Sequence, residues 1–339
     1  MLLNSLTEGL DQMTYRFLLL LVFVFSSLAG SSLNAQVRDL TADDIDAWVK
    51  ELSNWGRWGK NDQLGALNLI TPKKRVQAAQ LVKEGVSVSL SVVAQTEEAP
   101  DNPQPFVHTM LNWGKGTDSQ WASDNFNVSY HGLVHTHMDS LCHLFYKDKL
   151  YNGFSRNDIT ETGANKLSIH NVKNGILTRG ILVDIPELRG VDYLEPGTPI
   201  YPEELERWEM RTGVKVEAGD VVFIRTGRFA RRKEKGPWSE KDGMAGLHAS
   251  CAKWIHNRDI AMLGSDAASD VIPSGVAGID FPIHLLTIHA MGIHIFDNCD
   301  LEALHAQCKK SKRWHFLIQS APIPVKGGTG SPLNPIATF

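Results

Sequence analysis

Two short apolar runs constrain the fold of this chain most strongly. Residues 181–185 and 221–224 are apolar almost without interruption, as expected of strands that a sheet buries on both faces. Residues 86–92 instead alternate between apolar and polar side chains, which predicts a strand with one wet face. Two further strands are expected, at 293–296 and 314–319. Strands of both kinds indicate a mixed sheet.

Helical segments lie between these strands. Thr41 is suited to cap a first helix, and Thr71 with Pro72 opens a second that ends by Gly85. The order of helices and strands places the chain in the α/β or α+β class. No long linker, repeat or low-complexity tract divides the residues after 35, so we expect one domain over 36–339. Further helices are expected at 203–211, 247–256, 281–291 and 300–308.

The N-terminal segment is typical of an export signal. Arg16 precedes an apolar run over 17–25, and small residues lead to a cleavage site after Ala35. The run is too short to span a bilayer, and a start at Met13 gives the usual basic n-region. We therefore expect a signal peptide over 1–35 and a periplasmic or secreted protein without stable membrane insertion. A permanent N-terminal anchor is the alternative.

Composition bears on partners and cysteine chemistry. The 339 residues include 34 Lys and Arg against 38 Asp and Glu. The net charge of -4 does not indicate the basic surface that binds nucleic acid. We expect a small molecule as the partner. The 4 cysteines are too few and too scattered for a disulfide-held fold, although Cys299 and Cys308 could pair in an oxidising compartment.

The strongest chemical signal lies between residues 130 and 143. On an extended strand alternate side chains share a face, so His135, His137 and Asp139 project together. Two imidazoles and a carboxylate are suited to bind Zn²⁺ or Mn²⁺ and to leave positions open for water. His143 follows the strand, where it could exchange protons with that water. The alternative is a set of surface or core histidines without a metal.

This segment resembles the signature of the metal-dependent cyclase-like hydrolases, the family of bacterial kynurenine formamidase and isatin hydrolase. The family motif reads His-x-Gly-Thr-His-x-Asp-x-x-x-His, and Thr136, His137, Asp139 and His143 match it. By position, the resemblance makes His137 and Asp139 metal ligands and His143 the catalytic acid/base. Other stretches that look like the longer members of the family are 58–59, 62–68, 219–222, 264–266 and 328–335.

The chain departs from the family at the first histidine of the motif. That position holds Leu133, which cannot bind a metal. His135 is our candidate replacement, and His131 competes with it. The resemblance also implies a later histidine and carboxylate, for which His284 and Asp297 lie nearest, with a spacing one residue longer. Four residues have a lesser claim: His289 and His294 as alternative ligands, and Asp266 and Asp270 as turn or cap residues.

The resemblance implies a hydrolase in which metal-activated water attacks the carbonyl of an amide, lactam or lactone in a small cyclic or aromatic molecule. Export favours an isatin-hydrolase type of activity over an arylformamidase. Two other functions stay open: an exported small-molecule or metal-binding protein without turnover, and a dehydrating cyclase. Aromatic residues before the metal strand could wall a pocket for a flat ring, with ordinary packing as the alternative; they are Trp58, Phe106 and Trp113, with Trp55 and Trp121.

The resemblance also implies the swivelling β/β/α fold of that family, with a mixed sheet and peripheral helices. It further implies a homodimer or homotetramer in which a neighbouring subunit completes the site.

Overall fold

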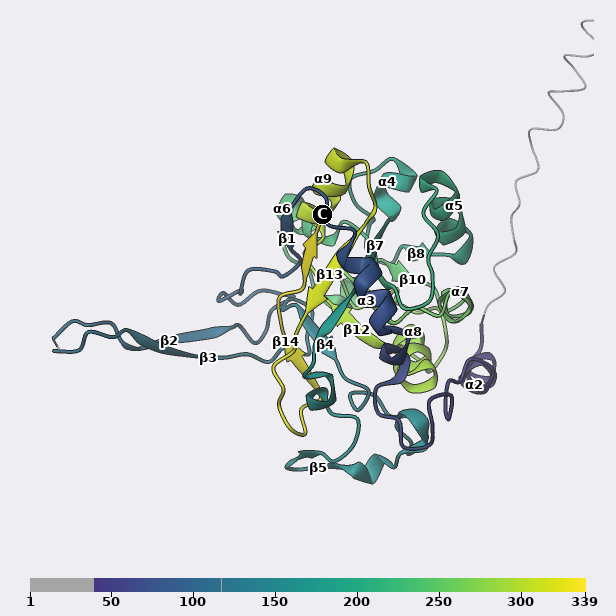
Figure 1. The fold of residues 1–339 in the computed structure, drawn as a ribbon, viewed down its shortest axis with the longest axis horizontal. Coiled ribbons are helices and arrows are strands. Elements are labelled where there is room, and N and C mark those ends of the chain that lie inside the picture. Colours follow the sequence, from purple (N-terminus) through teal and green to yellow (C-terminus); the bar gives the residue numbers. More distant parts are fainter. Residues whose placement is uncertain (1–39, 117) are drawn as a thin grey trace, which may run out of the picture. The chain divides into compact units, whose positions relative to one another are not determined.

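A computed structural model describes residues 40–116 and 118–339, so the expected signal peptide over 1–35 lies outside the described residues. A mixed sheet of nine strands organises this part of the chain (Figure 1). The central strands β7, β9, β11 and β12 are parallel, and their outer neighbours pair antiparallel. In spatial order the strands are β1 (Ser87–Ser89), β15 (Ile336–Thr338), β13 (His315–Ser320), β7 (Ile176–Asp184), β9 (Val221–Arg225), β11 (Met262–Ser265), β12 (His294–Asp297), β4 (His137–Asp139) and β14 (Gly330–Pro332).

Helices and three small two-stranded sheets surround the large sheet, which confirms the mixed α/β class. The α-helices are α2 (Ala42–Glu51), α3 (Pro72–Ala79), α4 (Ile185–Arg189), α5 (Pro202–Thr212), α6 (Arg228–Lys235), α7 (Cys251–Asn257), α8 (Pro282–His284) and α9 (Glu302–Ser311). The shorter 3₁₀ turns are η1 (Gly65–Leu69), η2 (Tyr151–Gly153), η3 (Arg156–Asp158), η4 (Ile169–Val172) and η5 (Glu240–Asp242), and η6 (Leu285–Met291) is a π-helix. The small sheets pair β2 (Val107–Asn112) with β3 (Ser123–Asn127), β8 (Pro199–Ile200) with β10 (Gly246–Leu247), and β5 (Ile159–Thr160) with β6 (Gly163–Ala164).

The central strands are buried on both faces, as their continuous apolar runs predict. On β9, Val222 and Ile224 join one apolar cluster, with residues of α2, α5 and α7. Val221 and Phe223 join a second cluster, with residues of α9 and β13. Because successive side chains on a strand point to opposite faces, only an apolar run fills both clusters at once.

The ends of three predicted helices differ from expectation. The helix that begins at Pro72 ends at Ala79 rather than Gly85, because the chain turns so that the Gly85 N–H donates to the Phe339 carbonyl. Leu247 belongs to strand β10, and the helix predicted from it begins at Cys251. The helix predicted over 281–291 divides into α8 and the π-helix η6.

Cys299 and Cys308, which could pair in an oxidising compartment, are not paired in the structure. All four cysteines are buried free thiols, and these two are packed in the second apolar cluster. Burial raises the pKa of both thiols, because an apolar surrounding disfavours the thiolate.

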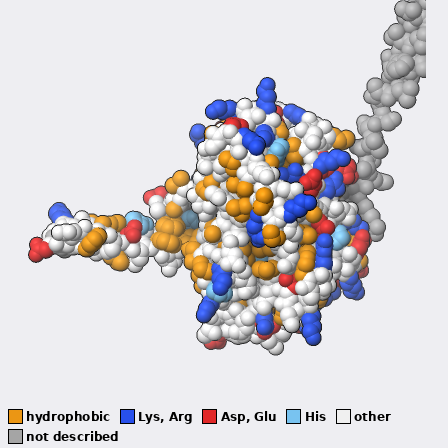
Figure 2. Space-filling view, viewed as in Figure 1, with side chains coloured by type: hydrophobic (Ala, Val, Ile, Leu, Met, Phe, Trp, Pro, Cys, Tyr) orange, Lys and Arg blue, Asp and Glu red, His pale blue; other side chains and the backbone are white. Residues whose placement is uncertain are grey.

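The hairpin of β2 and β3 projects away from the sheet (Figure 1) and carries exposed apolar side chains along its length (Figure 2). Trp113 and Trp121 lie in this excursion and are 64% and 77% exposed. Among helices in the described ranges, none is long and apolar enough to cross a membrane.

Candidate metal centre

Strand β4 carries the centre of the candidate site. Its alternation places His137 and Asp139 on one face, and β12 pairs with it so that Asp297 lies opposite His137. One ligand atom from each of these three side chains lies within 4.8 Å of the others. All three side chains are buried, because β4 runs between β12 and β14 inside the sheet.

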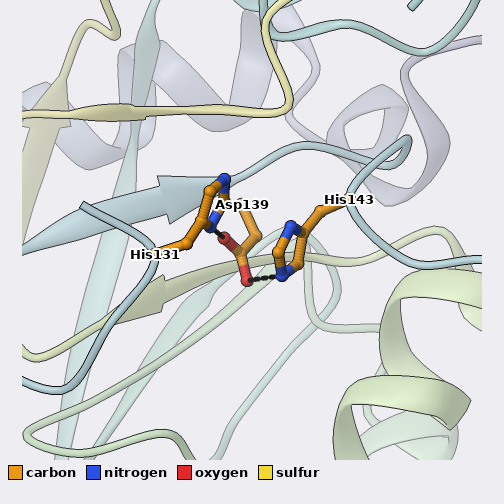
Figure 3. A group of neighbouring side chains, drawn as sticks. All are labelled: His131, Asp139 and His143. Atoms are coloured by element: carbon orange, nitrogen blue, oxygen red, sulfur yellow. Dashed lines mark ion pairs between the residues drawn. The ribbon is translucent and has the colours of Figure 1, made fainter. Parts of the chain in front are cut away.

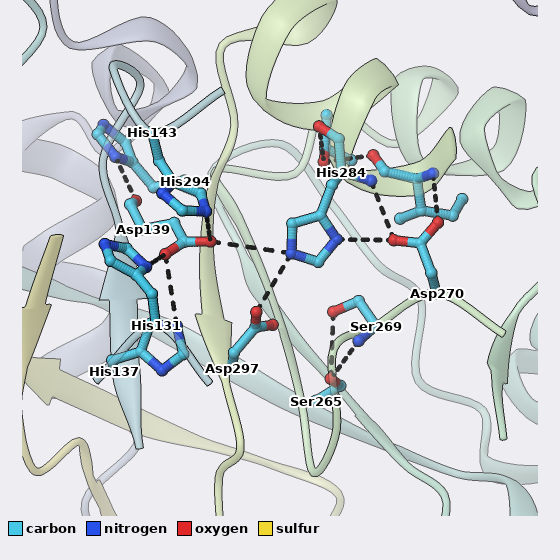
Figure 4. A network of polar contacts seen from close by, with 12 residues as sticks. His131, His137, Asp139, His143, Ser265, Ser269, Asp270, His284, His294 and Asp297 are labelled. Carbon is cyan, nitrogen blue, oxygen red and sulfur yellow. Dashed lines mark hydrogen bonds and ion pairs between the residues drawn. The ribbon is translucent and has the colours of Figure 1, made fainter. Parts of the chain in front are cut away.

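His284 reaches the same point from α8 (Figure 4). Its Nε2 lies 3.2 Å from Asp297 Oδ2 and 3.8 Å from Asp139 Oδ2. Its Nδ1 is hydrogen-bonded to Asp270 Oδ2 at 2.6 Å. Because Nδ1 is committed to Asp270, Nε2 is the nitrogen directed at the two carboxylates.

A second group stands beside the first and shares Asp139 with it (Figure 3). His131 Nδ1 lies 3.0 Å from Asp139 Oδ1, and His143 Nε2 lies 3.8 Å from Asp139 Oδ2. The two imidazoles stack with ring centroids 4.0 Å apart and planes inclined by 9°. Their side chains are 27% and 32% exposed, so this group forms the outer side of the site.

Asp139 carries a negative charge that its histidine neighbours stabilise. Burial alone would raise its pKa, but the neighbouring His143, His131 and His137 hold it well below its usual range. Burial lowers the pKa of His143 more than the Asp139 charge raises it, which favours a neutral imidazole.

The donor set fits a divalent cation. Oδ1 of Asp297 is buried and accepts no hydrogen bond from the described residues, and the buried Oδ1 of Asp139 is contacted by the ring nitrogens of His131 and His137. Two buried carboxylates this close repel each other unless a positive charge lies between them, and either a bound cation or a protonated His284 supplies that charge. Imidazole nitrogens and carboxylate oxygens without a thiolate suit Zn²⁺ or Mn²⁺.

The structure brings together His137, Asp139, His284, Asp297 and His143 from the predicted site. His135 belongs to neither group of ligand atoms found in the described ranges. The physical reason is that β4 begins at His137, so the alternation that would align His135 with His137 does not extend back to it. His131, the competing candidate, lies in the second group, with Asp139 and His143.

The predicted aromatic residues do not gather into one wall. The Phe106 ring lies 6.1 Å from the His135 ring. Trp58 packs against the first apolar cluster. Trp113 directly follows β2 and is exposed.

Of the other candidate ligands, His294 and His289 enter neither group of ligand atoms in the described part of the chain. His294 Nδ1 is hydrogen-bonded to the Asp139 carbonyl at 3.1 Å, so this histidine braces β4. Asp266 is a cap, as predicted, and accepts from the N–H groups of Thr226 and Gly227 before α6.

The roles of two residues at the site, Asp270 and Tyr130, are not predictable from the sequence pattern. Asp270 is recognisable there as a cap residue, but its bond to His284 depends on tertiary structure. The Tyr130 ring lies 4.6 Å from that of His131 and 5.9 Å from that of His137, and its hydroxyl donates to the Gly330 carbonyl at 3.0 Å. Tyr130 therefore fixes both imidazoles against β14.

Buried histidines and carboxylates on adjacent strands of a mixed sheet define an α/β protein with a candidate divalent-metal centre. The chain matches the model of one family, described as "Putative cyclase", over residues 74–270. A crystal structure of a novel cyclase is 31% identical with a TM-score of 0.77, and the match covers 85% of this chain and 100% of that one. The chain belongs to this cyclase family.

More distant structures share the fold. Isatin hydrolase A from Ralstonia solanacearum is 19% identical with a TM-score of 0.55, over 79% of this chain and 97% of that one. Isatin hydrolase A from Labrenzia aggregata, bound to benzyl benzoate, is 18% identical with a TM-score of 0.54, over 77% and 94%. No curated protein matches the chain.

Proposed function

We propose that this protein is a metal-dependent hydrolase that opens or cleaves an amide, lactam or lactone carbonyl in a small cyclic or aromatic molecule. The observation that carries the proposal is the position of Asp139, which belongs to both His/Asp groups. The group of His137, Asp139 and Asp297 is buried and suited to hold a cation. The group of His131, Asp139 and His143 is partly exposed, so a substrate can approach it.

The buried side chains His137, Asp139 and Asp297, with His284, would hold the cation. A bound divalent cation polarises a carbonyl group and lowers the pKa of water. Asp139 and Asp297 would supply the negative charge that holds it, and the hydrogen bond from His284 to Asp270 would keep the imidazole in the ligating orientation.

His143 is the residue placed to move protons. Its Nε2 faces Asp139 from the exposed side, and stacking on His131 fixes the plane of its ring. From this position His143 Nε2 takes a proton from the attacking water and returns it to the leaving nitrogen or oxygen. Phe106, whose ring lies 6.1 Å from that of His135 on the segment leading into β4, would contact a flat substrate ring.

Replacing His143 tests the proposed role. His143→Ala should lower turnover of N-formylkynurenine, isatin or simple lactones by about 100-fold or more, with metal content unchanged. His170→Ala, which alters a histidine on η4 that belongs to neither group, is the matched control. Equal turnover in His143→Ala and wild type would contradict the assignment.

A binding protein without turnover is the second candidate, favoured by Leu133 at the position where the resembling family has a histidine. It predicts that metal-loaded protein binds metal but hydrolyses no ester, lactone or anilide in a broad panel. A dehydrating cyclase would instead yield a cyclised product without net hydrolysis.

We also propose that the protein is exported and forms a homodimer or homotetramer. The assembly is supported by the exposed apolar side chains of the β2–β3 hairpin, since exposed patches of this kind commonly mark interfaces. Light scattering on the purified protein tests it, and a monomer at micromolar concentration would contradict it.

A further inference from the structure

A pocket with a lining separate from the candidate metal centre lies between α2, the turn at 146–149 and the π-helix η6. Its volume is about 390 Å³, within the range of small-molecule sites. None of the proposed metal ligands lines it. We call it the aromatic pocket, and it is lined by Asp46, Val49, Lys50, Ser53, Trp55, Tyr146, Lys147, Lys149 and His289.

Two aromatic rings in the pocket are fixed in place around His289. The Trp55 ring lies edge-on to the His289 ring at 5.2 Å, and its Nε1 donates to the His289 carbonyl at 2.7 Å. The Tyr146 ring lies 5.9 Å from the His289 ring, also edge-on, and its hydroxyl donates to Asp46 at 2.6 Å. These rings form rigid flat walls, which favour a planar ligand.

His289 brings an unpartnered acceptor to this pocket. The residue is 2% exposed, and its Nδ1 has no hydrogen-bond partner among the described residues. The Lys149 backbone is a hydrogen-bond partner of the ring, and in the tautomer protonated at Nε2 the unpartnered Nδ1 is the acceptor. Burial lowers the pKa of His289 to about 4, so the ring is neutral at neutral pH and Nδ1 can accept an N–H.

The rim supplies positive charge that is not neutralised. Asp46 already pairs with Lys147 at 2.6 Å and with the Tyr146 hydroxyl. Lys50 and Lys149 form no ion pair with the described residues, so two free ammonium groups border the apolar walls. A ligand carboxylate would find its partners here.

We propose that the aromatic pocket is a second binding site, for a planar aromatic carboxylate that carries an N–H group. The ligand ring packs against Trp55 and Tyr146, the N–H donates to His289 Nδ1, and the carboxylate pairs with Lys50 and Lys149. Hydrolysis of a lactam fused to an aromatic ring yields such a molecule: water adds to the carbonyl, the C–N bond breaks and the nitrogen takes a proton. Only this link to a reaction product rests on the proposed function.

Calorimetric titration of the metal-free full chain with 2-aminobenzoate tests the site. One site is expected, with benzoate binding about tenfold more weakly because it lacks the N–H. His289→Phe should remove this difference between the two compounds. Lys149→Gln, at the exposed rim, should weaken both several-fold, whereas Lys253→Gln, outside the pocket, should change neither.

The metal-centre variant His137→Ala separates this site from the proposed activity. It should bind 2-aminobenzoate as wild type does, whether or not the protein proves to be a hydrolase. No binding, equal affinity for benzoate and 2-aminobenzoate, or affinity that is insensitive to Lys149→Gln would each overturn the second site. Loss of binding in His137→Ala would place the ligand at the metal centre and overturn it as well.

Discussion

Asp270 holds His284 at two points: one carboxylate oxygen, Oδ2, lies 2.6 Å from the imidazole Nδ1 and 3.1 Å from the backbone nitrogen of the same residue. The other oxygen accepts from the Ile283 N–H at 2.6 Å. The carboxylate thus caps α8 and orients the ring that this helix carries. Capping and ligand orientation are therefore inseparable at this residue.

Asp270→Asn should weaken metal binding about 10- to 100-fold, because one of the two oxygens that accept from Ile283 and His284 becomes an NH₂ group and the His284 Nδ1 loses its carboxylate partner. Competition with a metal-sensitive dye measures the affinity. Asp62→Asn, which alters a carboxylate outside both His/Asp groups, is the control. Unchanged affinity in Asp270→Asn would show that the orientation of His284 does not depend on Asp270.

The two candidate replacements for the histidine absent at Leu133 are separable by mutation. His131→Ala should weaken metal binding or activity about tenfold or more, because His131 Nδ1 lies 3.0 Å from Asp139. His135→Ala should leave metal content unchanged. Elemental analysis and turnover of both variants decide the matter, and the reverse pattern would favour the alternation predicted from sequence.

These two histidines show how far the sequence alone can lead. Alternation on a strand correctly groups His137 with Asp139, because both lie inside β4. It misplaces His135 because periodicity does not reveal where a three-residue strand begins. His131 approaches Asp139 through the bend before β4, a path that depends on contacts with β14 and has no periodic signal.

In the fold, too, the features set by local sequence are predictable and those set by distant contacts are not. Runs such as 221–224 predict central strands reliably because both sheet faces are apolar clusters. The end of α3 is not predictable locally, since the chain turns there to meet Phe339, far away in sequence. The ring-orienting role of Asp270 is hidden for the same reason, although its nature as a cap is not.

Gly65 should tolerate no side chain. Its φ is +59°, and an added Cβ would collide with the Gly292 backbone oxygen, which the Ala66 N–H also contacts at 2.7 Å. Gly65→Ala should lower the free energy of unfolding by about 3 kcal/mol, as overpacking and backbone strain combine. Gly56→Ala has a similar φ of +77° but open space around it, so it should cost only about 1 kcal/mol. Urea unfolding measures both, and equal losses would contradict the steric account.

His289 should make stability depend on pH. Its pKa is about 4 in the folded chain against an ordinary 6.5, because burial disfavours the charged ring. Between these values the unfolded chain binds a proton that the folded chain does not, so stability falls as pH drops from about 6.5 to about 4. The full effect is at most ~3 kcal/mol. The ionisable groups that line the pocket with this ring are Asp46, Lys50, Tyr146, Lys147 and Lys149.

His289→Phe should flatten this part of the pH dependence relative to wild type. Urea unfolding at several pH values between 4 and 7 measures the difference, which removes the contribution of the other histidines. Parallel curves for the two proteins would show that His289 is charged, or exposed, in the folded state.

The metal content of the protein, purified without a histidine tag, tests the central claim most directly. Elemental analysis of wild type and His137→Ala, with circular dichroism to confirm folding, is sufficient. The account predicts one or two Zn or Mn ions per wild-type chain and their loss from a folded His137→Ala variant. A folded wild type that binds neither metal, or a variant that retains the wild-type content, would contradict it.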